Sequence, residues 1–161
     1  MANPTPYRAL PAERRHRLLK HAIASSREVR ALYIQRLAAL PGGFRPVTLQ
    51  SWPADKLAQE VVRRRAEKPE DEADLLLLLY VEIQPEIQTA FLDAAGVKHE
   101  GGRIDDELEA PYTDEAGVRR GVEVVRERFG SDGAHYLWTI LRYNRAAWPG
   151  IEALVEDAPP A

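Results

Sequence analysis

The chain has 161 residues, of which 45% are hydrophobic and 29% charged, and its formal net charge is −3 at pH 7. This length suits one domain of ordinary size that buries a core without a metal or a disulfide. The chain contains no cysteine, which excludes disulfides, thiol nucleophiles and thiolate metal sites.

The charges are unevenly distributed along the chain. Residues 1–68 hold 14 Lys/Arg and 5 Asp/Glu, a net of +9, whereas residues 69–161 hold 8 and 20, a net of −12. Such asymmetry is typical of a polyanion-binding half beside an acidic half. It also fits two halves of one fold that attract each other, or the basic and acidic faces of two copies that associate.

The N-terminal segment contains Pro4 and Pro6 and lacks the apolar segment of a signal peptide. It predicts a flexible arm over residues 1–10. No stretch of the chain reaches the ~20 apolar residues that a membrane span needs, so we expect a cytoplasmic protein without a membrane partner.

Apolar residues then recur at helical spacing and predict a first helix over residues 11–24. A second helix follows from Ser25, because Ser25 and Glu28 have the spacing of a capping box. Pro41 and the two glycines after it end that helix.

Residues 44–50 predict a connecting loop. Ser51 is placed to cap a third helix, with Pro53 tolerated in its first turn and an end at Pro69.

The most apolar stretch is residues 74–97, DLLLLLYVEIQPEIQTAFLDAAGV. Between residues 75 and 83 only Glu82 is polar, so a helix there has no wide polar face and should be buried, with Leu77 in the core. Pro85 predicts a kink or a restart, of which we favour the restart with Pro85 in the first turn. Gly96 should end the second piece in a left-handed conformation.

Residues 98–112 predict a long irregular segment, and Thr113 is predicted as the N-cap of the helix after it. Gly117 and Gly121 lie on one side of that helix and predict close approach of another backbone. Gly130 should separate this helix from a last long one.

We therefore predict an all-α, single-domain helical bundle of about six to eight helices around a buried Leu-rich central helix. The helical domain should cover residues 11–155, and residues 156–161 should form a disordered tail.

A dense basic strip is the first candidate binding surface. It combines cations of the first two predicted helices, and such clusters supply most of the affinity for nucleic-acid phosphates. The alternative is that these residues only solvate two surface helices. The candidate binding residues are Arg14, Arg15, Arg17, Lys20, Arg27 and Arg30.

A second candidate site lies in the polar loop at residues 98–109. His99 and Glu100 are candidate catalytic residues, because a loop histidine beside a carboxylate can act as a general acid or base. No nucleophile accompanies them. The alternative interpretation is that the loop is ordinary surface structure.

A metal site is the third candidate. Glu82, Glu86 and His99 offer oxygen and nitrogen ligands near the most apolar helix. The glutamate with a histidine three residues later, which carboxylate-bridged metal bundles use, is missing. We therefore predict no cofactor.

These observations favour a non-catalytic α-helical module that binds another macromolecule, with a protein partner or self-association first. Nucleic-acid or ribonucleoprotein binding through residues 11–36 is the first alternative. An enzyme that uses a metal-bound carboxylate or His99 near the 98–109 loop is the second.

Overall fold

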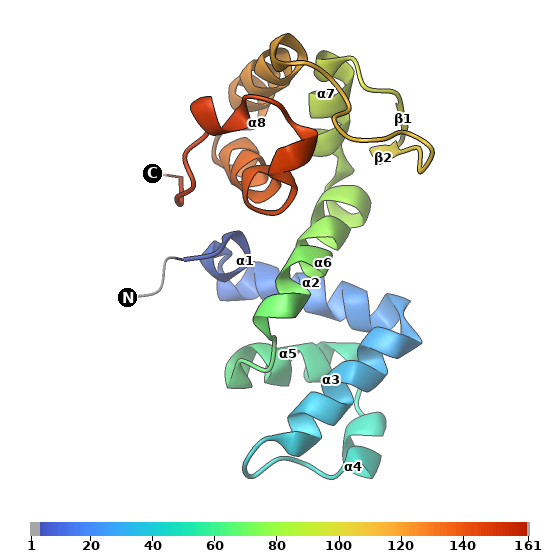
Figure 1. Cartoon of the computed structure of the whole chain (residues 1–161). Helices are drawn as coiled ribbons and strands as arrows, with labels where there is room; N and C mark the ends of the chain where they lie inside the picture. Colours follow the sequence, from blue (N-terminus) through green and yellow to red (C-terminus); the bar gives the residue numbers. More distant parts are fainter. Residues whose placement is uncertain (1–3, 161) are drawn as a thin grey trace. The chain divides into compact units, whose positions relative to one another are not determined.

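The computed structural model describes residues 4–160 and is built almost entirely of helices, with one small hairpin (Figure 1). Eight α-helices are present in the described residues, which confirms the predicted all-α class. The chain divides into two compact units. We call Leu10–Leu78 the α2–α6 unit, and the residues up to Ala9 together with those from Leu79 onward the α7–α8 unit. The domain limits at residues 11 and 155 stay a prediction.

The α2–α6 unit is built on two long helices that pack against shorter ones. Helix α2 packs against α3, α5 and α6, and α3 also packs against α4 and α5. The elements are α2 (Ala12–Ser25), α3 (Arg27–Ala39), α4 (Pro46–Gln50), α5 (Ala54–Arg64), the 3-10 turn η1 (Pro69–Asp71) and α6 (Glu72–Leu78). Its fully buried side chains include Leu18, Leu19, Tyr33, Leu37, Leu49, Leu57, Val61 and Leu76.

The junction between α2 and α3 differs by one residue from the prediction. Ser25 is the last residue of α2, so the extended backbone that a cap requires falls at Ser26. The Ser26 hydroxyl accepts a hydrogen bond from the Val29 amide at 3.2 Å. Ser26, and not Ser25, is therefore the N-cap of α3.

The predicted loop at residues 44–50 is wrong in its second half, which forms α4. Pro46 starts this helix at a position where its ring presets the backbone and its missing N–H costs nothing. Leu49 is fully buried and anchors the helix. Ser51 does not cap α5, because its hydroxyl donates to the Thr48 carbonyl at the end of α4, at 2.7 Å.

The Leu-rich stretch is helical but is not buried all round. Helix α6 leads into a π-helical turn, η2 (Leu79–Ile83), which begins the α7–α8 unit. Leu76 is 1% exposed, whereas Leu77 is 60% exposed. The prediction that Leu77 lies in the core is therefore wrong, because an all-apolar run carries no periodicity that could identify its solvent face.

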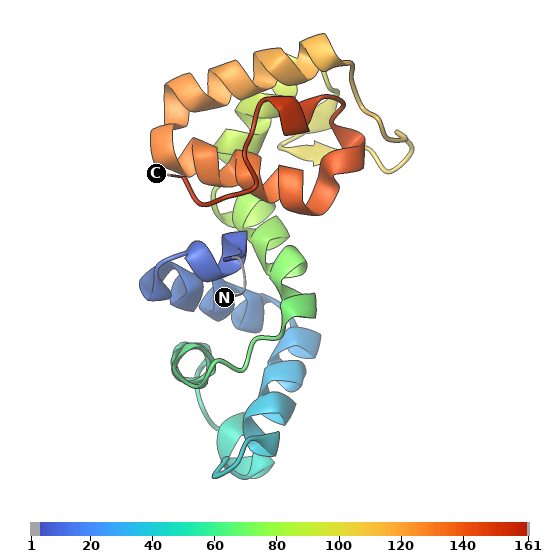
Figure 2. The same ribbon diagram turned by 60° about the vertical axis from the view of Figure 1, so that its left-hand side comes forward.

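The α7–α8 unit centres on α7 (Pro85–Ala95), which packs against α8 (Glu115–Asn144). Gly130, with φ +53°, breaks α8 into two helical halves that run back alongside each other (Figure 2). Both long helices predicted there are confirmed. The 3-10 turns η3 (Arg145–Ala147) and η4 (Ile151–Ala153) follow α8.

The restart at Pro85 is confirmed. Gln84 leaves the helical region with φ −132° and ψ 65°, and Pro85 occupies the first turn of α7. Gly96 ends the helix with φ +75°, and the Val97 amide donates to the Leu92 carbonyl at 2.9 Å. This is the left-handed ending that the sequence predicts.

The two glycines of α8 allow α7 to approach closely, as predicted. A Cβ atom at Gly117 would lie 2.8 Å from the Ala95 carbonyl oxygen, and one at Gly121 would lie 2.7 Å from the Phe91 ring. Asp114 caps α8 by accepting from the Gly117 amide at 2.8 Å. Thr113, which the sequence favoured as the cap, instead donates to the Ala95 carbonyl at 2.9 Å.

The long segment after α7 contains a hairpin that the sequence did not predict. Strands β1 (His99–Glu100) and β2 (Arg103–Ile104) pair antiparallel. Gly101 and Gly102 join them with φ values of +59° and +88°. Two successive positive φ angles are what a two-residue hairpin turn of the primed type requires.

The chain ends also differ from the prediction. Part of the predicted flexible arm is the helix α1 (Pro6–Ala9), whose Tyr7 is fully buried, while residues 1–3 lie outside the described residues. In the predicted tail, Asp157 accepts hydrogen bonds from Trp138 Nε1 and Arg142 Nε, both at 2.9 Å. Tertiary partners fix these segments, which local sequence cannot reveal. Residue 161 lies outside the described residues.

Among the described residues, no single helix is long and apolar enough to cross a membrane. The helical segments Pro69–Ile83 and Pro85–Ala95 pass that test only as a bent pair, on length and composition alone.

Candidate functional site

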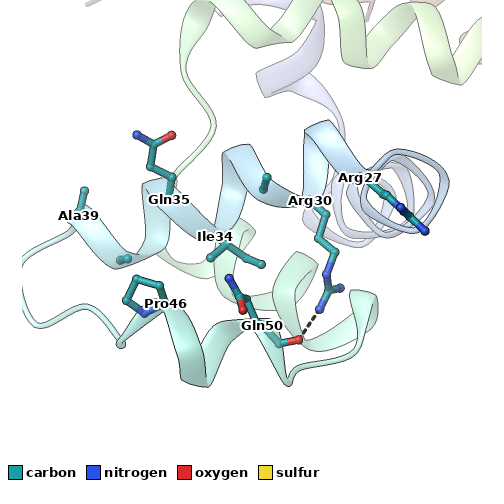
Figure 3. Close-up of a pocket in the computed structure, with 9 residues that line it drawn as sticks. Arg27, Arg30, Ile34, Gln35, Ala39, Pro46 and Gln50 are labelled. Carbon is teal, nitrogen blue, oxygen red and sulfur yellow. Dashed lines mark hydrogen bonds between the residues drawn. The ribbon is translucent and has the colours of Figure 1, made fainter.

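An open groove runs between α3 and α4 within the α2–α6 unit. Its volume is about 630 Å³. Helix α3 forms one wall and α4 contributes the other (Figure 3). The lining residues are Arg27, Arg30, Ala31, Ile34, Gln35, Ala38, Ala39, Pro46 and Gln50.

The groove exists because α4 is short and its wall is made of small or exposed side chains. Leu49 alone among the residues of α4 is buried. The α3 wall carries three alanines, Ala31, Ala38 and Ala39, so no large side chain fills the space between the helices. A concave surface with a mostly apolar lining and a few polar groups is the usual form of a binding site.

The charged groups of the groove lie at one end. Arg27 and Arg30 stand in the first turns of α3, and Ala39 and Pro46 lie at the other end (Figure 3). No acidic residue lines the groove. The formal charge of the groove is therefore positive and confined to the start of α3.

The two arginines differ in their partners. Arg30 Nη2 donates to the Gln50 carbonyl at 3.0 Å and to the Trp52 carbonyl at 2.7 Å, which fixes the end of α4 against α3. The Arg27 side chain is exposed and has no hydrogen bond or ion pair with residues 4–160. Arg27 is therefore the cation of the groove that is available to a partner.

Two further residues of the predicted basic strip pair with carboxylates of their own unit. Arg17 pairs with Glu13 one turn away at 2.7 Å. Lys20 lies 3.6 Å from the carboxylate of Asp55. Arg14 and Arg15 are half-buried on α2. Of the six predicted binding residues, the groove brings together only Arg27 and Arg30.

An ion pair between Arg36 and Asp71 connects the basic and acidic halves of the sequence. Arg36 of α3 forms a bidentate pair with Asp71 of η1, in which Nη2 donates to Oδ1 at 3.0 Å. Each side chain is 12% exposed. At this contact, opposite charges of the two sequence halves meet inside the α2–α6 unit.

His99 has a structural role in the hairpin. The Gly102 amide donates to His99 Nδ1 at 3.0 Å, so Nδ1 carries no proton, and Nε2 donates to Asp93 Oδ1 at 2.5 Å. Gln88 of α7 donates to the Gly102 carbonyl at 2.5 Å and holds the same turn. Both ring nitrogens of this catalytic candidate are thus occupied, and its neighbour Glu100 is exposed.

The metal candidates do not converge. Glu82 pairs with Arg103 of β2 at 3.2 Å, and Glu86 is exposed in the first turn of α7. His99 is held by Asp93, as described above. Over residues 4–160, no group of three or more His, Asp or Glu side chains is placed to hold a metal ion.

The α7–α8 unit contains a buried polar cluster that the sequence did not predict. His135 Nε2 donates to the Pro6 carbonyl at 2.7 Å, and His135 Nδ1 is hydrogen-bonded to the Tyr80 hydroxyl. Because a carbonyl only accepts, Nε2 carries the ring proton and Nδ1 accepts from Tyr80. The cluster ties α1 and η2 to α8. Tyr80 lies in an all-apolar run and His135 is remote from it, so no local signal could have joined them.

The resolved pKa shifts lie outside the groove. Burial raises the pKa of Tyr136 above its ordinary range, and neighbouring Tyr80 adds to this effect. The hydrogen bond from Trp138, assisted by Arg142, lowers the pKa of the Asp157 carboxyl. The hydrogen bond from Arg63 lowers the pKa of Glu60.

The α3–α4 groove was also not predicted from the sequence. On α3 its residues follow a helical stripe with steps of three and four, but the stripe mixes arginine, alanine and glutamine. Such a mixed stripe does not predict an apolar binding face. Comparison of the chain with known protein families, curated proteins and solved structures gives no significant match, so the groove is interpreted from its own geometry.

Proposed function

We propose that this chain is a non-catalytic helical module that binds another protein, and that the α3–α4 groove is the binding surface. The observation that carries this proposal is the open groove itself, with small apolar side chains along its length and an available cation, Arg27, at one end. Surfaces of this kind recognise protein segments through apolar burial, with polar groups setting orientation.

The geometry favours a side-chain-lined groove over the other modes of peptide recognition. Strand addition requires an exposed sheet edge, and the walls of this groove are helices. Recognition of proline-rich segments requires aromatic walls, and no aromatic residue lines the groove. The helical and mostly apolar walls favour a helix laid into the groove.

Nucleic-acid binding has less support. A phosphate backbone needs a track of available cations. In this chain Arg17 and Lys20 pair with carboxylates, and Arg30 donates to two backbone carbonyls. An enzyme at the 98–109 loop also has less support, because both ring nitrogens of His99 are engaged.

The proposal can be tested by selection from a displayed library of three-turn helical peptides. The library is selected on the wild-type chain and compared with selection on Ala31→Trp. Ala31 is an exposed residue of the groove, so the indole should fill the space without disturbing the core. We expect peptides that bind the wild type and lose at least ~10-fold in affinity on Ala31→Trp, since their contact surface is blocked.

The matched control is Ala24→Trp, which adds the same side chain at an exposed position of α2 outside the groove. Ala24→Trp should leave peptide binding unchanged. Peptides that bind both tryptophan variants as well as the wild type would contradict the proposal. RNA or DNA binding that falls after Arg14, Arg15 and Arg17 are changed to alanine would support the nucleic-acid alternative instead.

A further inference from the structure

The distribution of charge in the groove indicates the chemistry of its partner. Both cations that line it, Arg27 and Arg30, stand in the first turns of α3, and the remaining lining residues are uncharged. We infer that the partner is an amphipathic α-helix with small apolar residues on one face and carboxylates at the end that lies against Arg27. This inference rests on the proposed function.

The dimensions of the groove fit a short helix. The α3 wall extends from Arg27 to Ala39, and 13 residues of α-helix span roughly 20 Å. A partner helix of about three turns fits within that length. The alanines of the wall allow two helix backbones to approach closely, so the partner should carry small or medium apolar side chains at spacings of three and four.

Charge complementarity identifies the end groups of the partner. The Arg27 guanidinium is exposed and has no partner among residues 4–160, and it lies at the positive end of the α3 dipole. Glu28, the acidic residue of that turn, does not line the groove. A carboxylate of the partner would meet an unneutralised positive site there, whereas a lysine would be repelled.

The two arginines should contribute differently. Arg27 contacts the partner directly and should determine its charge preference. Arg30 acts as a positioning residue, because its hydrogen bonds to the Gln50 and Trp52 carbonyls hold the end of α4 in place. Loss of Arg30 should weaken all groove binders equally, irrespective of their charge.

The test uses a displayed library of three-turn helical peptides whose terminal positions are Glu, Gln or Lys. Groove-dependent binders, identified by their loss on Ala31→Trp, should carry Glu at one end. For these peptides Arg27→Gln should lower affinity about two- to fivefold near ~0.1 M salt, and the effect should shrink near ~0.5 M salt. The matched control, Arg63→Gln, removes an exposed arginine of α5 outside the groove and should have no effect.

Two results separate this inference from the proposed function. Groove-dependent binders with Gln or Lys at both ends, or an unchanged affinity on Arg27→Gln, would overturn the acidic partner and leave the groove as a binding surface. The absence of any peptide that discriminates wild type from Ala31→Trp would overturn both. Groove-dependent self-association of the chain alone, measured by sedimentation of wild type and Ala31→Trp, would also overturn the acidic helix as partner.

Discussion

The α7–α8 contact and the α3–α4 contact join helices in opposite ways, each within its own unit. At Gly117 and Gly121 the helices are so close that one added methyl group would collide with a backbone carbonyl or an aromatic ring. Between α3 and α4 a space of about 630 Å³ stays open. The α7–α8 contact is therefore closely packed, whereas the α3–α4 contact leaves apolar surface open, which we propose a partner covers.

The first prediction sharpens this comparison by testing whether the α2–α6 unit has a closed core apart from its groove, with one face of α6 buried in that core. Leu76→Ala should lower the free energy of unfolding by ~3 kcal/mol, because it leaves a cavity in a closed core. Its neighbour Leu77 is the matched control, since Leu77→Ala at a 60% exposed position should cost under ~0.5 kcal/mol. Chemical denaturation of both variants measures the difference. Equal losses of unfolding free energy would mean that Leu76 is not buried while Leu77 is exposed, as the structure has them.

The second prediction adds atoms to each contact. Gly121→Ala should destabilise by ~2 kcal/mol despite the better helix propensity of alanine, because the new Cβ would collide with the Phe91 ring. Ala31→Trp in the groove should change the free energy of unfolding by less than ~0.5 kcal/mol. Thermal or urea unfolding checks both, and Glu123→Ala on the exposed face of α8 controls for the alanine itself. An increase in the free energy of unfolding on Gly121→Ala would contradict the close contact of α7 and α8 at this position.

The third and smallest effect concerns the C-terminal segment of the α7–α8 unit. The pKa of Asp157 is lowered by Trp138 and Arg142, so its charged form stabilises the fold above the ordinary aspartate pKa. That contribution is lost as pH falls through the lowered pKa. Because Asp157 is 42% exposed, solvent screening limits the contribution to about 1 kcal/mol.

The corresponding measurement is the free energy of unfolding of wild type and Asp157→Asn from pH 7 to pH 2. The wild type should be the more stable form at pH 7. The two curves should begin to converge below about pH 4, the ordinary aspartate pKa, and should meet below the lowered pKa of Asp157. A difference that persists at pH 2 would show that the carboxylate charge is not its source.

Local chemistry explains what the sequence could predict. The restart at Pro85, the left-handed ending at Gly96 and the close approach at Gly117 and Gly121 each follow from the backbone properties of one or two residues. These features need no knowledge of distant partners.

Features that depend on distant partners were missed. The exposure of Leu77 has no signal in an all-apolar run, and the five residues of α4 depend on the burial of Leu49. The groove is still harder to predict from the sequence, because it forms where no large side chain fills the space between two helices. Arg27 and Arg30 were predicted as binding residues for their charge, but the different roles that we propose for them depend on the hydrogen bonds of Arg30 to the Gln50 and Trp52 carbonyls.

The central claim, that the α3–α4 groove is the binding surface, is tested most directly by backbone amide chemical shifts. A helical peptide selected on the wild-type chain alone is titrated into isotope-labelled wild-type chain. The largest shifts should fall in α3 and α4, between residues 27–39 and 46–50, and should vanish with Ala31→Trp. Shifts concentrated on the 98–109 loop, or unchanged by Ala31→Trp, would contradict the claim.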